Sequence, residues 1–550
     1  MKENKSDMKS ILIKNGNIID GTGNPWFKAD LLIEQEKIKE ISRCIKDCDA
    51  NRTIDATDLI VSPGFIDIHT HSDHTILLGE GENALTQGVT THVVGNCGFS
   101  ATPPINPNKL KEEDYDTFKL ILAPILAISE VESKYQRLNE YLNDLKQKRI
   151  PINIIPLIGH SMLRLNVLGL DNRVPNSNEL QEMKDILAEE MEYGAFGMST
   201  GLDYPPGSFS ETEEIIELCK VVKEYNGIYT SHFRGFGIGL IRATKEAIKI
   251  AKTGIPVEIS HFKPFGFYFG DIKKACRLIE KAREDNLDIT FDVFPQASNY
   301  TFLFALIPPW VYYTKEKLDI PRALDILKQT KTDNDLKNKI YEEIDNIVES
   351  FLKIKKQEDW IKVYIDAPNR PDYGGKTIYQ ISLEKNIDPR EALIQILIDV
   401  KGSANATYLS MSEEDNIITI AHPLSMFASD GQIIPEENDK IFPNPYCYGC
   451  FTRALGKYVR EEKLLTLHDA IRRMTSFPAQ KLGLKDRGLL REGFWADVTI
   501  FDHRKIIDKA TYENPRLYSE GIEYVFVNGA LAYDQGKFTG ALSGVPLSRK

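Results

Sequence analysis

A short apolar run closes on two histidines in the stretch Phe65-Ile66-Asp67-Ile68-His69-Thr70-His71. Apolar, β-branched runs of this length are typical of buried strands. Residues two apart in a strand share a face, so His69 and His71 are expected to project together from its end. A His-x-His pair alone is only moderately specific for a metal site, so its meaning depends on what the rest of the chain brings to the same place.

Similar apolar runs recur along the chain and alternate with longer helical patterns, which is typical of parallel βα units. Eight runs can be counted, and they end near His71, Cys97, His160, Gly201, Arg234, Lys263, Pro295 and Asp430. Eight strands with crossover helices predict an α/β fold of the (β/α)8 TIM barrel type. In such a barrel the functional groups lie at the carboxyl ends of the strands.

The interval between the last two runs is too long for one helix and two loops. It spans roughly 130 residues, which predicts an insertion after barrel strand 7. Its pattern is mainly helical around residues 302–405. This insertion is either a cap beside the mouth of the barrel or a surface ornament.

Both ends of the chain contain short alternating strands. Asn15-Gly16 near the N-terminus and Asn528-Gly529 near the C-terminus are hairpin turn signals. We therefore expect a small β-sandwich domain formed by residues 1–62 and 488–550, with the barrel domain at residues 63–487.

The composition excludes several classes of protein. The 550 residues carry 68 Lys and Arg against 80 Asp and Glu, a formal charge of −12, whereas a nucleic-acid binder would normally show a basic excess. No apolar stretch approaches the ~20 residues of a membrane helix. Seven cysteines are too few and odd in number for a disulfide framework. We expect a cytoplasmic protein that acts on a small molecule, and we leave its oligomeric state open.

Three further strand ends carry groups that suit a divalent metal. His232 and His261 end two strands, and they join His69 and His71 if all four face the lumen. Buried imidazoles are costly without partners, so packing alone explains them poorly, whereas imidazole is the commonest metal ligand. Cys97 ends another strand, and its thiolate would be a soft zinc ligand.

Asp430 follows the last candidate strand, within Phe427-Ala428-Ser429-Asp430-Gly431. A carboxylate there can ligate a metal and can accept a proton from water as a general base. An Asp-Gly pair alone is simply a turn. Its position at the end of the eighth strand is what makes Asp430 a candidate.

These segments together resemble the N-acyl-D-amino-acid deacylase (D-aminoacylase) family of the amidohydrolase superfamily. The resemblance is carried by residues 64–71, the Gly95-Asn96-Cys97-Gly98 strand end, the two histidine strands and Ser429-Asp430-Gly431, and it covers nearly the whole chain from Ile11. It implies a zinc-dependent amidohydrolase that cleaves N-acyl-D-amino acids, or closely related N-acylated small molecules, to a carboxylate and a free amine.

The resemblance also implies roles for individual residues. Zinc would be held tightly by Cys97, His232 and His261, and a second, weaker metal position would lie beside His69, His71 and Asp430. Asp430 would also be the general base. The candidate substrate-binding residues are Lys263 and Arg234 for the substrate carboxylate, with Lys263 favoured, Tyr204 for the oxyanion, and Ser429 and His160.

Two other functions remain open. One is a cyclic amide hydrolase of the dihydroorotase or hydantoinase type. The fourth strand makes this function less favoured, because it has Ser199 and Thr200 instead of a lysine. The other is a catalytically silent binding scaffold of the same fold, although every metal ligand is retained. Residues 294–300 and 444–446 depart from the family pattern, so an apolar or aromatic side chain, a dipeptide-like ligand or a cyclic amide could all be accommodated.

Overall fold

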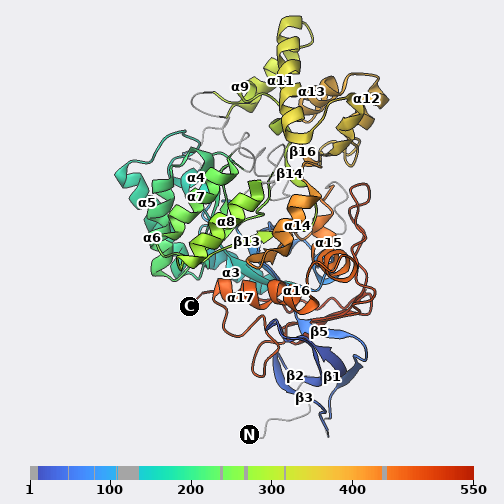
Figure 1. Cartoon of the computed structure of the whole chain (residues 1–550). Helices are drawn as coiled ribbons and strands as arrows, with labels where there is room; N and C mark the ends of the chain where they lie inside the picture. Colours follow the sequence, from blue (N-terminus) through green and yellow to red (C-terminus); the bar gives the residue numbers. More distant parts are fainter. Residues whose placement is uncertain are drawn as a thin grey trace.

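The computed structural model describes residues 10–46, 49–79, 81–106, 108–109, 135–235, 239–264, 271–314, 318–435 and 442–549. Figure 1 shows three regions along the molecule: a sheet at one end, a central body of strands and helices, and an inserted region at the other end. Within the described ranges, no helix has both the length and the apolar character that a membrane crossing would need.

The central body contains the parallel strands expected from the sequence. One sheet has the order β6 (Phe65–Asp67), β7 (Val89–Val94) and β8 (Asn153–Pro156). The other has the order β17 (Ser425–Phe427), β13 (Ile289–Val293), β12 (Val257–Ile259), β11 (Ile228–His232), β10 (Gly197–Gly201) and β9 (Ile158–Gly159).

The two parallel sheets approach each other at both junctions. At one, β8 runs almost directly into β9, with only Leu157 between them. At the other, Thr70 pairs with Gly431 in an isolated parallel bridge, and the amide of His71 donates to the carbonyl of Gly431 over 2.7 Å. The strand order of a (β/α)8 barrel is therefore present, but its hydrogen bonds form two sheets instead of one closed ring.

Helices alternate with these strands. They are α1 (Glu82–Leu85), α3 (Leu138–Lys148), α4 (His160–Val167), α5 (Ser177–Glu192), α6 (Thr212–Glu224), α7 (Leu240–Ala251), α8 (Asp271–Glu284), α14 (Glu413–Ala421), α15 (Tyr446–Arg453), α16 (Leu467–Met474) and α17 (Ser476–Leu482). In α7 the buried residues Leu240, Ala243, Ala247 and Ile250 recur every three or four positions, so one face packs inward. Asn176 begins α5 with a capping box, which satisfies amides that the first helical turn leaves free.

Strands from both ends of the chain form one nine-stranded sheet, so the two termini come together as expected. Its strands are β1 (Ser10–Ile18), β2 (Phe27–Glu34), β3 (Lys37–Ser42), β4 (Arg52–Asp55), β5 (Ile60–Pro63), β18 (Val498–Phe501), β19 (Ile522–Val527), β20 (Ala530–Asp534) and β21 (Lys537–Phe538). Hydrogen bonding is continuous because β5 pairs antiparallel with β18 and so joins the two ends of the chain. Ile13, Leu31, Val498 and Phe526 share one buried core.

The two predicted hairpin turns had different outcomes. Asn528-Gly529 connects β19 to β20, and both residues have the positive φ of a tight hairpin turn. The prediction of a turn at Asn15-Gly16 was wrong, because these residues lie within β1. They form an irregularity there, where the pairing with β2 shifts register between Ile13 and Gly16.

The insertion after β13 has its own sheet and its own core. Strands β14 (Asn299–Phe302), β16 (Asn405–Tyr408) and β15 (Val363–Asp366) form an antiparallel sheet in that order, a feature that the helical pattern had not revealed. The helices are α9 (Pro309–Tyr312), α10 (Ile320–Gln329), α11 (Asn334–Leu352), α12 (Ile378–Lys385) and α13 (Pro389–Asp399). This region lies at the far end of the molecule from the terminal sheet (Figure 1).

Candidate metal centre

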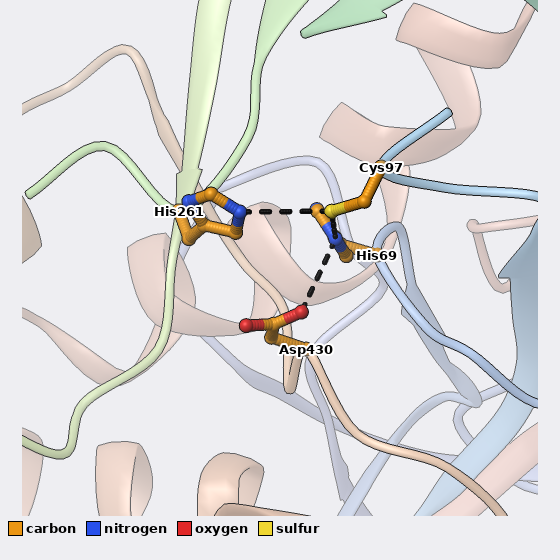
Figure 2. A group of neighbouring side chains, drawn as sticks. All are labelled: His69, Cys97, His261 and Asp430. Carbon is orange, nitrogen blue, oxygen red and sulfur yellow. Dashed lines mark hydrogen bonds and ion pairs between the residues drawn. The ribbon is translucent and has the colours of Figure 1, made fainter. Parts of the chain in front are cut away.

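Side chains from several strand ends converge on one point. His69, Cys97, His261 and Asp430 each place one ligand atom within 4.8 Å of the others (Figure 2). They follow β6, β7, β12 and β17, so they are far apart in the sequence and meet only through the fold. The three ligands other than Asp430 are almost completely buried, and the Asp430 side chain is 18% exposed.

Most of the separations between the ligand atoms lie in the range expected around a zinc ion. Two ligands at about 2.0–2.3 Å from a tetrahedral zinc lie about 3.3–3.8 Å apart. The Cys97 Sγ atom lies 3.3 Å from His69 Nε2, 3.6 Å from His232 Nδ1 and 3.7 Å from His261 Nε2. His232 Nδ1 and His261 Nε2 are 2.9 Å apart, slightly closer than that range. The donor types are those that zinc takes, and three of these four separations lie in the expected range.

The backbone is strained at three of these positions. Cys97, His261 and Asp430 have positive φ angles of 51°, 35° and 55°. A residue other than glycine held there costs roughly 1–3 kcal/mol, and such strain concentrates at functional sites. The strand ends bend in this way at the residues that point into the cluster.

The electrostatics of the cluster favour a thiolate. Burial alone would raise the pKa of the Cys97 thiol, but the imidazoles of His69 and His232 outweigh it and hold that pKa well below its usual range. Burial also opposes a charge on Asp430, yet His69 and His71 hold the pKa of its carboxyl well below normal. Their Nε2 atoms lie 3.3 and 3.2 Å from Asp430 Oδ1. Both shifts favour the charged forms of these groups, a thiolate and a carboxylate.

A cavity of about 320 Å³ opens beside the cluster, which is within the range of small-molecule sites. His71, Cys97, His232, His261 and Asp430 all line it. The insertion also contributes to the lining, through residues that include Tyr300, Phe302, Tyr312 and Phe351. Of the two roles left open for the insertion, this contribution favours a cap over the site.

A protein-family model matches the parts of the sequence that carry most of this cluster. The model of the amidohydrolase family matches residues 52–228 and 420–533, which together make up more than half of the chain. The chain belongs to the amidohydrolase family. The matched ranges include His69, His71, Cys97 and Asp430.

Relatives of this amidohydrolase cover its full length. It is 30% identical to D-aminoacylase of Alcaligenes xylosoxydans xylosoxydans, over 100% of this chain and 99% of the relative. It is 32% identical to N-acyl-D-glutamate deacylase of the same organism, over 96% and 94%. The crystal structure of N-acyl-D-glutamate deacylase from Bordetella bronchiseptica, complexed with zinc and a phosphonate mimic of the tetrahedral intermediate, matches with a TM-score of 0.80 and 30% identity, over 99% of this chain and 100% of that one.

The two cations predicted to hold the substrate carboxylate have other partners in this amidohydrolase. Lys263 is buried, and its Nζ atom donates to the carbonyls of Phe294 and Gln296. Arg234 forms an ion pair with Glu246 at 3.0 Å and donates to nearby backbone carbonyls. Neither is among the described residues that line the cavity, so their predicted role stays a prediction.

The other three candidate substrate residues differ in their position relative to the cavity. Tyr204 lines the cavity, and its ring centroid lies 4.6 Å from that of His232. His160 lies outside the cavity lining and is buried, with Nε2 at 2.8 Å from Glu214 Oε1. Ser429 precedes Asp430, and its hydroxyl accepts a hydrogen bond from the amide of Gly431. Of these three residues, Tyr204 alone is in the described lining of the cavity.

Two acidic residues near the cluster were missed from the sequence. Asp292 lies in β13, with Oδ2 at 3.1 Å from His69 Nδ1, while Oδ1 accepts the backbone amide of His261 over 2.7 Å. The two-residue alternation that identified the histidines could also have placed Asp292 on the inner face of its strand. Asp203 lies in the loop after β10, with Oδ2 at 4.0 Å from His232 Nε2, and no spacing rule would have found it.

Proposed function

We propose that this amidohydrolase is a zinc-dependent deacylase that hydrolyses the amide bond of N-acyl-D-amino acids, or of closely related N-acylated small molecules. The products are a carboxylate and a free amine. The observation that carries the proposal is the cluster of a thiol, imidazoles and a carboxylate lining one cavity of small-molecule size. Full-length relatives named as D-aminoacylase and as N-acyl-D-glutamate deacylase support the same reaction class.

In this proposal Cys97, His232 and His261 hold the tightly bound zinc, and a weaker metal position lies beside His69, His71 and Asp430. Zinc would supply Lewis acidity that polarises the amide carbonyl and the attacking water. Asp292 fixes the orientation of His69 and of the His261 backbone through the two contacts of its carboxylate, a support that metal-binding histidines commonly have.

The protein's own groups move the proton. Asp430 is ionised, and His69 and His71 fix the position of its Oδ1 atom. That oxygen accepts the proton of the attacking water and then gives it to the departing amine, because cleavage of the C–N bond requires a protonated leaving group. Burial raises the pKa of Tyr204, so its hydroxyl keeps its proton and can donate to the tetrahedral oxyanion.

The cavity wall favours an apolar substrate side chain. Phe302, Tyr312, Phe351 and Met411 are among its lining residues, and the described part of the lining includes no lysine or arginine. A charged substrate side chain would have to leave water for these apolar groups, which is costly without a cationic partner.

A panel of N-acetyl amino acids tests both the reaction and this preference. We expect kcat/KM for the D-phenylalanine, D-leucine and D-methionine derivatives to exceed that for the D-glutamate derivative by at least about tenfold, with the L-enantiomers cleaved poorly. Amine release and zinc content are measured on the same preparation. No amine release from any D-substrate would contradict the proposed function, and a preference for D-glutamate would contradict the apolar site alone.

A matched pair of variants links the preference to the cavity. Phe302→Ala removes an aromatic ring from the wall and is expected to lower kcat/KM for the D-phenylalanine derivative by about 10-fold or more, with a smaller effect on D-alanine. Phe477→Ala removes a partly buried ring that is not part of the lining. It is expected to leave the ratio of kcat/KM for the D-phenylalanine derivative to that for the D-alanine derivative unchanged.

A further inference from the structure

The turn that carries Cys97 is an unusual piece of backbone. Gly95, Cys97 and Gly98 all have positive φ angles, of 80°, 51° and 81°. L-residues rarely adopt such a conformation, so the turn needs contacts from outside to hold it. Those contacts decide where the Cys97 sulfur points, because the side chain is short and has a single rotatable bond before the sulfur.

Strand β10 packs directly against this turn. A Cβ atom added at Gly201 would lie 2.1 Å from the carbonyl oxygen of Cys97, so the two backbones are in close contact. Ser199 lies two residues before Gly201 and therefore faces the same side of the strand. Its side chain is fully buried.

The Ser199 hydroxyl bridges the two ends of the turn. It accepts a hydrogen bond from the amide of Gly98 over 3.0 Å and donates to the carbonyl of Gly95 over 2.5 Å. A hydroxyl can do both because it combines one donor with acceptor lone pairs. The residues joined in this way lie immediately after and two before Cys97, so the bridge closes the turn around the ligand.

We propose that Ser199 is a positioning residue for Cys97, and that its hydroxyl fixes the direction of the Cys97 sulfur toward the metal. The inference rests on the proposed zinc site. Ser199 itself does not touch the substrate or the metal in this role. Groups that orient a metal ligand in this indirect way typically contribute about 10–100-fold to metal affinity.

The neighbouring residue provides a matched control. Thr200 is in the same strand and is equally buried, but its hydroxyl contacts Tyr229 and Ser231 instead of the Cys97 turn. Thr200→Val removes that hydroxyl at nearly constant volume. The variant therefore shows how much the loss of a buried β10 hydroxyl lowers zinc affinity and stability when the Cys97 turn keeps its hydrogen bonds.

The test is zinc affinity, measured by competition with a chromophoric chelator. Ser199→Ala is expected to bind zinc about 10–100-fold more weakly than the unmodified protein, whereas Thr200→Val and the hydroxyl-retaining Ser199→Thr stay close to it. Cobalt substitution gives a second readout, since the thiolate-to-cobalt absorption should fall only in Ser199→Ala. Thermal unfolding confirms that each variant is folded. Unchanged zinc affinity and unchanged cobalt absorption in folded Ser199→Ala would overturn the inference and leave the deacylase proposal standing.

A metal-free readout separates the two proposals fully. Alkylation of Cys97 by iodoacetamide, followed by mass spectrometry, measures how accessible and reactive the thiol is in the zinc-free protein. We expect Cys97 in Ser199→Ala to react several-fold faster than in the unmodified protein and in Thr200→Val. If the unmodified protein took up no zinc, the proposed function would fail, and the alkylation rates would still decide the role of Ser199: equal rates in all variants refute it.

Discussion

Replacing Cys97 with alanine is expected to weaken zinc binding more than about 100-fold and to abolish turnover with it. Loss of an indirect supporting contact costs about 10–100-fold in metal affinity, so loss of the ligand itself should cost more. Cys97 lies within 3.7 Å of His69, His232 and His261 and offers them a soft anionic donor. Without it, His232 and His261 remain 2.9 Å apart with no thiolate beside them.

Metal content after dialysis and chelator competition measure this effect. Cys219→Ala is the matched control, because Cys219 is also fully buried but lies in α6, outside the cavity lining. It is expected to keep its zinc even if it loses some stability. A Cys97→Ala protein that retained zinc with unchanged affinity would remove the cysteine from the metal site.

The sequence predicted that side chains from several strand ends would converge, because strand geometry is local. The alternation of side chains along a strand depends only on the strand, and the carboxyl ends of parallel strands meet at one edge. His69, Cys97, His261 and Asp430 follow such strand ends, so their convergence could be predicted, and the structure places their ligand atoms within 4.8 Å of one another. Which of them hold a metal stays a prediction.

Contacts made by loops could not be predicted in this way. Lys263 is one such case: its Nζ atom meets the carbonyls of Phe294 and Gln296 because the chain turns back there after β13. The same turn leads into the insertion, whose strand β14 brings Tyr300 and Phe302 to the cavity. Nothing in the periodicity of this segment indicated that the two rings would line the cavity beside the metal cluster, because their partners lie in other parts of the chain.

Substituting Asp430 with asparagine is expected to lower kcat by about 10²–10⁴-fold, the contribution typical of a general acid–base group, while the tight zinc stays bound. The amide keeps the shape of the carboxylate and can still contact His69 and His71, but it cannot accept the proton of water. The tight ligands proposed here, Cys97, His232 and His261, are unaffected by the change. Steady-state kinetics and metal analysis of the same sample separate the two effects.

Asp203→Asn serves as the control for charge loss in the cavity, because Asp203 lines the same cavity but contacts the cluster only at 4.0 Å from His232. It is expected to lower kcat by less than about tenfold, below the range of a general base. If Asp430→Asn turned over at a nearly normal rate, the proton would have to travel through another group. Asp203 would then be the carboxylate to test, and a large loss in Asp203→Asn would transfer the role to it.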